Sequence, residues 1–202
     1  MSKGTLFVLL SPSGGGKGSV MKELLETEKK LRCSVSATTR KPRPGEIDGR
    51  HYFFMDRAGF EGMIEKGTML EHAQYCGNYY GTPKAAVEKW QNDGLDVILE
   101  IEVQGAVQVK RLAADAVSIF IMPPSFEILE NRLRRRGTET EEVIASRLKA
   151  ARDEIAYAQS CDYIVVNDKL QDAVDDVRAI IRASRCRIEN MRDFVKGVQE
   201  NA

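Results

Sequence analysis

Residues 11–18 read S-P-S-G-G-G-K-G and combine the glycines and the lysine that a phosphate-binding loop requires. The segment follows the apolar run TLFVLL and precedes a stretch with helical periodicity, which is the strand, loop and helix context of such loops. Backbone N–H groups of the loop and the N-terminus of the following helix attract phosphate, and Lys17 adds a positive charge. An ordinary glycine-rich turn is the alternative on these residues alone.

Two positions depart from the full pattern G-x-x-x-x-G-K-[ST]. Ser11 replaces the first glycine, and Gly18 replaces the hydroxyl residue that normally contacts Mg²⁺. Because the backbone turn holds phosphate more than the side chains do, Gly14, Gly16 and Lys17 are the essential residues, and all three are present. The expected nucleotide-binding set is Ser11, Pro12, Ser13, Gly14, Gly15, Gly16, Lys17, Gly18 and Ser19.

A basic segment stiffened by prolines, TTRKPRPGEIDGR, contains Arg40 and Arg43, and Tyr52 lies just beyond it. The planar guanidinium group of arginine suits bidentate contact with phosphate oxygens, and prolines hold such a loop open at low entropic cost. A solvated basic loop explains the same residues equally well. Beside a phosphate loop, the segment suggests a second phosphate, which belongs to another substrate.

Glu100 and Glu102 lie on one side at the carboxyl end of the apolar run LDVILEI. Acidic side chains at such a strand end, near a phosphate loop, commonly organise Mg²⁺ directly or through water. The sequence therefore predicts a metal-organising role for Glu100, either direct or through water.

Several arginines cluster in the segment RLRRRG, which by itself is weak evidence for nucleic-acid binding in a chain of no net charge. On a helix, Arg132, Arg135 and Arg136 share one side, and Arg147 lies on the next predicted helix. Cationic groups of this kind stabilise the charge that spreads over a migrating phosphoryl group. A solvated face is the alternative for Arg134 and Arg135.

The composition is that of a globular chain without an overall electrostatic field. Its 202 residues suffice for one sizeable domain, with 43% hydrophobic and 30% charged residues. Lys and Arg number 30 and so do Asp and Glu, which argues against nucleic acid or an anionic membrane as a partner. The four cysteines form no C-x-x-C pair, so a zinc ribbon or redox dithiol is not expected. The opening apolar run is too short for a signal-peptide core or a membrane span, and the expected location is cytoplasmic.

Strand-like apolar runs occupy residues 5–10, 33–37, 51–55, 95–101, 116–122 and 162–166. Stretches of helical periodicity separate most of them, which predicts an α/β fold with a mostly parallel sheet flanked by helices. The C-terminal stretch 170–195 is expected to form one amphipathic helix.

The segment at about 38–83 breaks this alternation and predicts a small β-rich insertion. Gly77 and Asn78 indicate a hairpin turn, and Thr82–Pro83 is expected to cap the helix that follows. Further on, Gly137 is expected to end a helix over 126–136.

The residues Thr138–Glu141 have capping-box spacing before a helix over 143–158. Together with the preceding helix, this arrangement predicts a hinged helical lid at about 132–147.

Four blocks, in this order and spacing, resemble the guanylate kinase family: SVSATTRKPRPGEIDGRHYFF, EHAQYCGNYYGT, PPSFEILENRLRRRGTETEEVIASRL and DYIVVND. The resemblance covers about residues 4–184 and leaves 185–202 as a C-terminal helical extension. It implies a P-loop kinase with a core that carries the loop at 11–18, a β-rich GMP-binding insertion and a helical lid. The implied activity is transfer of the γ-phosphoryl group of ATP to GMP, giving ADP and GDP.

The resemblance also implies roles for individual residues. The residues expected to hold the phosphate of GMP are Arg40, Arg43, Tyr52 and Tyr80. Those expected around the guanine ring are Ser36, Glu71, Thr82 and Glu102. The expected catalytic residues are Lys17, Arg40, Arg132, Arg136 and Arg147. Near the adenine of ATP we expect Asn167 and Asp168.

The chemistry of guanine agrees with Glu71 independently. Guanine offers N1–H and 2-amino donors that one carboxylate can accept together, and an O6 acceptor for hydroxyl groups. Without the resemblance, a surface carboxylate is the alternative for Glu71, and an aromatic pair packing on the core is the alternative for Tyr79 and Tyr80. The family pattern leads us to expect Asp where this chain has Glu100 and Glu102, so the extra methylene leaves their roles open.

The expected partners are the small-molecule substrates ATP and GMP, with Mg²⁺ accompanying ATP as the cofactor and no nucleic acid or membrane involved. Both a monomer and a homodimer fit the sequence. A non-catalytic guanylate-kinase-like module that binds protein partners is the first alternative, suggested by Gly18 and the glutamate pair. A P-loop kinase for a different phosphorylated metabolite is the second.

Overall fold

A computed structural model describes residues 3–75, 77–135 and 140–200 of the chain. The predicted helix end at Gly137 and the start of the capping box at Thr138 lie outside these described residues, as does Arg136. Where the described chain resumes, α6 (Glu141–Tyr157) begins after Thr140, and no side chain caps it.

A five-stranded sheet forms the centre of the molecule, with strand order β2-β7-β1-β8-β9 and parallel pairing throughout. Its strands are β1 (Leu6–Leu10), β2 (Leu31–Cys33), β7 (Asp96–Glu100), β8 (Val117–Met122) and β9 (Tyr163–Val166). Strand β1 is buried along its whole length, which explains why it reads as a continuous apolar run instead of an alternating one. The predicted α/β class with a parallel sheet is confirmed.

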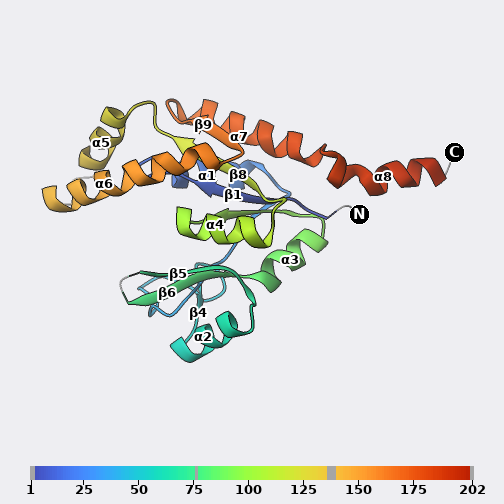
Figure 1. The fold of residues 1–202 in the computed structure, drawn as a ribbon, viewed down its shortest axis with the longest axis horizontal. Helices are drawn as coiled ribbons and strands as arrows, with labels where there is room; N and C mark the ends of the chain where they lie inside the picture. Colours follow the sequence, from blue (N-terminus) through green and yellow to red (C-terminus); the bar gives the residue numbers. More distant parts are fainter. Residues whose placement is uncertain (1–2, 76, 136–139, 201–202) are drawn as a thin grey trace.

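Helices cover both faces of this sheet (Figure 1). On one face, Phe7 and Leu9 pack with α1 (Lys17–Thr27) and α7 (Leu170–Arg185). On the other face, Leu6, Val8 and Leu10 pack with α3 (Lys84–Asn92) and α4 (Val103–Leu112). Alternate side chains of β1 therefore pack against the two helical layers on either side of the sheet, and these layers hold the phosphate loop in place.

A second, four-stranded sheet of order β4-β3-β6-β5 lies on the far side of α4 (Figure 1). Its strands are β3 (Ala37–Thr38), β4 (Phe53–Phe54), β5 (Met69–Tyr75) and β6 (Asn78–Pro83). The hairpin of β5 and β6 was predicted from its turn residues, and α2 (Arg57–Glu65) packs on this sheet through the buried Phe60.

Three predicted elements are wrong in detail. The run 33–37 is not one strand, because the chain leaves the parallel sheet after Cys33 and enters the second sheet at Ala37. The strand expected over 51–55 reduces to Phe53–Phe54. Thr82 does not cap α3, because its hydroxyl donates a hydrogen bond to Glu71 and the cap position falls on Pro83.

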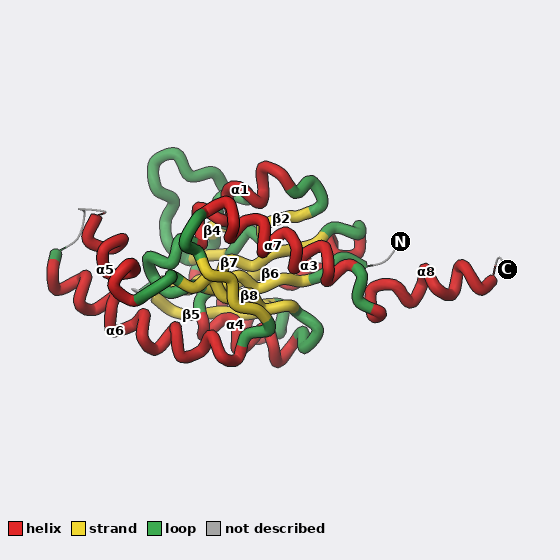
Figure 2. Tube along the Cα trace, turned by 90° about the horizontal axis from the view of Figure 1, so that it is seen from above, coloured by secondary structure: helices red, strands yellow, loops and turns green. Residues whose placement is uncertain are grey.

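The predicted helix over 170–195 is two helices, α7 and α8 (Ile188–Glu200). The side-chain amide of Asn190 donates to the backbone carbonyl of Ser184 and to the hydroxyl of Thr5. These bonds join the start of α8 to the end of α7 and to Thr5, and α8 projects beyond the body (Figure 2).

Helices α5 (Phe126–Arg135) and α6 lie together at the end of the molecule opposite α8, and the short 3₁₀ helix η1 (Ala158–Ser160) follows α6 (Figures 1 and 2). In the described part of the chain, no helix has the combination of length and apolarity that crossing a bilayer demands.

Candidate active site

Two cavities lie at the carboxyl end of β7 and share the side chains of Glu100 and Glu102 as lining. One, of about 430 Å³, is formed largely by the glycine-rich loop. The other, of about 320 Å³, lies between α4 and the second sheet. This arrangement offers two compartments with a common boundary, as a transfer between two bound molecules requires.

The glycine-rich loop has the backbone shape of an anion cradle. Gly14 and Gly16 have φ angles of 88° and 95°, which glycine adopts without the steric penalty of other residues. A Cβ atom on Gly16 would lie 2.2 Å from Nδ2 of Asn167, and that nitrogen donates to the carbonyl of Gly15 at 2.8 Å. Helix α1 begins directly after Gly16, so its positive end points into the loop.

Lys17 lines the cavity formed by the glycine-rich loop, and its ammonium group donates a hydrogen bond to the carbonyl of Ile101 at 3.1 Å. Burial lowers the pKa of Lys17, and the charges of Glu100, Glu102 and Glu154 act in the opposite direction. The carboxylates therefore help to keep the lysine protonated in a site from which water is partly excluded.

Two predicted lid arginines reach the loop region, and a third lies outside the described residues. Arg132 donates to the carbonyl of Asn167 at 2.8 Å, and among the described residues its buried Nη1 has no hydrogen-bond partner. Arg147 donates to the hydroxyl of Ser13 at 3.5 Å. The buried donor of Arg132 fits an anion that enters the loop. Arg136 is the third and has no described position.

The other described arginines of the cluster lie on a solvated face, which was the alternative given for them. Arg134 pairs with Glu130 and Glu141 and is exposed, as is Arg135. Asn167 is buried and supports the loop, whereas its neighbour Asp168 is exposed.

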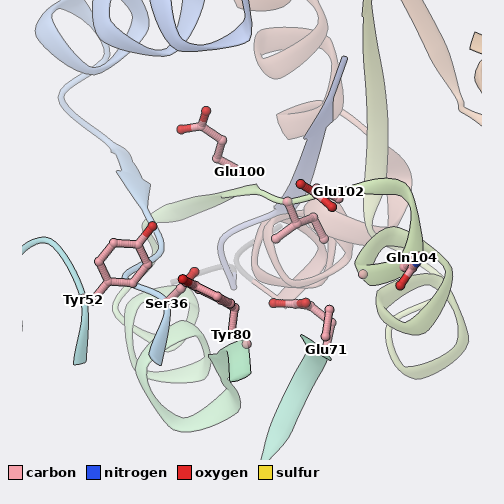
Figure 3. A pocket seen from close by; sticks show the side chains of 11 residues that line it. Ser36, Tyr52, Glu71, Tyr80, Glu100, Glu102 and Gln104 are labelled. Atoms are coloured by element: carbon pink, nitrogen blue, oxygen red, sulfur yellow. The ribbon is translucent and has the colours of Figure 1, made fainter. Parts of the chain in front are cut away.

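The smaller cavity gathers several residues predicted for the GMP side, drawn from both sheets (Figure 3). Ser36, Tyr52 and Tyr80 lie on one side of it, across from Glu100 and Glu102. The rings of Tyr52 and Tyr80 meet edge to face, with centroids 6.2 Å apart. Figure 3 also shows Glu71 directed into the same cavity.

Glu71 is a buried carboxylate, only 6% exposed, at the wall of this cavity. One of its oxygens accepts a hydrogen bond from the hydroxyl of Thr82 at 2.7 Å. The other faces α4, where a Cβ on Gly105 would lie 2.8 Å from it. Burial raises the pKa of Glu71, and the hydrogen bonds from Thr82 oppose that shift. A surface carboxylate, the alternative for this residue, is excluded.

The two basic-loop residues do not line this cavity as the structure has it. Arg40 forms a double hydrogen bond with Glu46, at 3.0 and 2.8 Å, while its guanidinium group lies 5.5 Å from the ring centroid of Tyr52. The Arg40 guanidinium and the backbone N–H of Arg43 lower the pKa of Glu46 to about 2. The side chain of Arg43 is exposed.

Sequence reasoning missed three residues that shape the site: Glu46, Gly105 and Glu154. Glu46 carries a local signal, because it is the acidic residue inside a basic proline-rich loop. Gly105 and Glu154 carry no such local signal, because each meets its partner only when the chain folds. Gly105 lies against the carboxylate of Glu71, and Glu154 accepts from the backbone N–H of Ser13.

The features of the fold and the site define a P-loop kinase: a parallel sheet, a glycine-rich loop at the start of α1, a lysine at the end of that loop and arginines from α5 and α6. A family-wide sequence pattern, described as guanylate kinase, matches residues 3–184. The chain therefore belongs to the guanylate kinase family, the enzymes that transfer a phosphoryl group from ATP to GMP.

Individual relatives agree with this assignment. The chain is 51% identical to the guanylate kinase of Desulfitobacterium hafniense over 96% of this chain and 98% of that protein. It is 50% identical to the guanylate kinase of Oceanobacillus iheyensis over 98% and 97% of the two chains. The crystal structure of guanylate kinase from Anaplasma phagocytophilum superposes with a TM-score of 0.76 at 35% identity and covers 98% of this chain and 96% of that one. These relatives give no support to the non-catalytic alternative.

Proposed function

We propose that this chain transfers the γ-phosphoryl group of Mg·ATP to the phosphate of GMP and releases ADP and GDP. The observation that carries the proposal is the pair of cavities with a common boundary at Glu100 and Glu102. One cavity has a phosphate loop, and the other has a buried carboxylate suited to guanine. In this assignment ATP occupies the first cavity and GMP the second.

On the ATP side, the backbone N–H groups of residues 14–18 and the ammonium group of Lys17 hold the triphosphate. Arg132 supports them, because its buried Nη1 is available to an incoming phosphate oxygen. Arg147 reaches the same loop from α6 at Ser13. These cations offset the charge on the migrating group, and no protein nucleophile takes part, since an oxygen of the GMP phosphate attacks in line.

On the GMP side, Glu71 selects guanine. Its carboxylate accepts the N1–H and 2-amino donors, while Thr82 and Gly105 fix its orientation. Adenine lacks both donors, so it would leave the buried carboxylate unpaired. The phosphate end of the site is formed by Arg40, Tyr52 and Tyr80. When GMP binds, Arg40 breaks its ion pair with Glu46 and pairs with the phosphate of GMP instead.

Mg²⁺ fits the residues present at the boundary of the two cavities. Among the described residues, no group of three or more His, Cys, Asp or Glu side chains is arranged to hold a metal ion. Mg²⁺ in kinases needs only one or two carboxylates, because phosphate oxygens and water complete its octahedron. Glu100, with Glu102 beside it, would supply those contacts, and the ion would neutralise charge between the phosphates.

A coupled assay of ADP formation with ATP and each nucleoside monophosphate tests the proposal. We expect ADP with GMP and at least about 10⁴-fold lower kcat/KM with AMP, because hydrogen-bonding sites of this kind discriminate that strongly. Equal turnover of GMP and AMP would overturn the role of Glu71. Binding of GMP without ADP formation at any Mg²⁺ concentration would favour the interaction module instead.

For the oligomeric state, a homodimer through α8 is the proposal. No residue of α8 is buried, and Ile188, Phe194 and Val198 are 59%, 64% and 55% exposed. The apolar positions 188 and 198, and 191 and 195, are placed symmetrically about Asp193. A two-fold axis at that residue would therefore pair position 188 with 198 and position 191 with 195 of the second copy in an antiparallel contact.

Analytical ultracentrifugation of the full chain and of Val198→Glu decides this point. A dimer that the substitution converts to a monomer, with kinase activity retained, supports the α8 contact. A monomeric unaltered protein at tens of micromolar, or a variant that remains dimeric, refutes it.

A further inference from the structure

Glu154 is a carboxylate that contacts the phosphate loop directly. Its Oε2 accepts a hydrogen bond from the backbone N–H of Ser13 at 3.2 Å, and its side chain lines the same cavity as Lys17. A phosphate loop binds anions through its backbone N–H groups. The carboxylate of Glu154 therefore uses a donor of the kind that a nucleotide phosphate needs.

Glu154 lies on α6, beyond the lid predicted at about 132–147, on the helix whose first part belongs to that lid. Glu154 and Arg147 are seven residues apart on α6, so they lie on the same face of that helix, two turns apart. Both reach Ser13: Arg147 contacts its hydroxyl and Glu154 its backbone N–H. Two side chains of α6 thus contact Ser13 of the loop.

The charges that line the loop cavity oppose an incoming triphosphate. Lys17 faces three carboxylates there, those of Glu100, Glu102 and Glu154. Glu100 and Glu102 lie at the boundary with the second cavity, where a metal ion would compensate them. Glu154 is on the loop side and contacts a donor directly, so triphosphate and carboxylate cannot both keep their preferred positions at Ser13 without repulsion.

We propose that Glu154 is a latch which occupies the phosphate loop in the nucleotide-free protein and which the triphosphate of ATP displaces. Displacement breaks the contact between Glu154 and the backbone N–H of Ser13, while Arg147, a cation on the same face of α6, lies on the side from which the phosphates enter. In this proposal ATP binding and the position of α6 are coupled through Glu154. The inference rests on the proposed ATP site and adds a residue that competes with the nucleotide for it.

Calorimetric titration of the full chain with a non-hydrolysable ATP analogue, with excess Mg²⁺ and separately with EDTA, tests the latch. We expect Glu154→Gln and Glu154→Ala to bind the analogue more tightly, by about fivefold in EDTA, which is the scale of one partly exposed charge interaction. The gain should be smaller with Mg²⁺, because the metal already screens the phosphate charge. Asp153→Asn is the matched control, since it removes the same charge from an exposed position of the same helix.

Amide hydrogen exchange separates a latch from a merely structural contact. In the absence of nucleotide, Glu154→Ala should exchange faster over α6 than the unaltered protein, and the difference should disappear once the analogue is bound. Equal or weaker binding by both Glu154 variants, or a gain matched by Asp153→Asn, would overturn the latch while leaving the ATP site intact. An unaltered protein that does not bind the analogue at all would overturn the ATP site, and the latch with it.

Discussion

The phosphate loop and the basic loop of the second sheet both place a carboxylate where a substrate phosphate is expected. In the basic loop, Glu46 pairs with Arg40 six residues away. In the phosphate loop, Glu154 reaches Ser13 across 141 residues of sequence. The first carboxylate belongs to the same loop as its partner, whereas the second arrives on a separate helix. Only displacement of the second can therefore move a distant element of the fold.

The largest effect is expected when the cation of the phosphate loop, Lys17, is removed and the GMP side is left intact. Lys17→Met should lower kcat by about 10³-fold, because a positioned cation on the transferring phosphoryl group contributes on that scale. The affinity for GMP, measured by calorimetry without ATP, should stay within about twofold of the unaltered value. A fall in kcat of less than tenfold would contradict the assignment of Lys17, provided that thermal unfolding shows an intact fold.

The second test changes the GMP side alone. Glu71→Gln should reduce kcat/KM for GMP by about 10²-fold, since the amide cannot accept both guanine donors. Binding of the ATP analogue should be unchanged. Loss of ATP-analogue binding to the same degree would show that Glu71 supports the whole fold instead of one cavity.

The same substitution makes a prediction for stability against pH. Burial raises the folded-state pKa of Glu71 above its ordinary 4.5, so the folded protein binds this proton more tightly than the unfolded chain. The contribution of Glu71 to stability therefore falls as pH rises from 4.5 through the raised pKa, and Glu71→Gln abolishes that fall. In thermal unfolding, the melting temperature of Glu71→Gln relative to that of the unaltered protein should be higher at pH 8 than at pH 5. An equal difference at both pH values would contradict this account.

A smaller effect is expected where the carboxylate is local. Glu46→Gln keeps an acceptor for the N–H of Arg43 but removes the charge that competes for Arg40, so GMP should bind about two- to fivefold more tightly. Glu65→Gln, which removes an exposed charge from α2, is the control. In contrast to Glu154→Ala, amide exchange over α6 should not change. Weaker GMP binding by Glu46→Gln would show that Glu46 serves to hold the loop in shape for GMP.

The smallest effect is expected at Gly18, where nothing lies within 4 Å of an added Cβ and a serine therefore fits. Gly18→Ser restores the hydroxyl that phosphate loops usually offer to Mg²⁺, so half-maximal rate should occur at about two- to threefold lower free Mg²⁺. The affinity for GMP should not change. Overlapping Mg²⁺ titrations of the two proteins would show that water replaces the hydroxyl without cost.

The sequence by itself determined the features whose partners lie close along the chain. The glycine-rich loop between β1 and α1, the hairpin of β5 and β6 and the parallel sheet follow from local patterns, because backbone geometry and hydrophobic periodicity are set within a few residues. The pairing of Glu46 with Arg40 is equally local, six residues apart in one loop, although the sequence patterns did not single out Glu46.

Only the tertiary structure decided which distant groups meet. Gly105 packs against Glu71, and Glu154 reaches the loop at Ser13. Near the C-terminus, Asn190 bonds to Thr5 across 185 residues, next to the break between α7 and α8 where periodicity had predicted one continuous helix. Helical periodicity records which face of a segment is apolar, but it does not record which polar group from another element will satisfy a backbone carbonyl or N–H. Those pairings arise when the layers pack, because a buried polar group must find a partner wherever the fold supplies one.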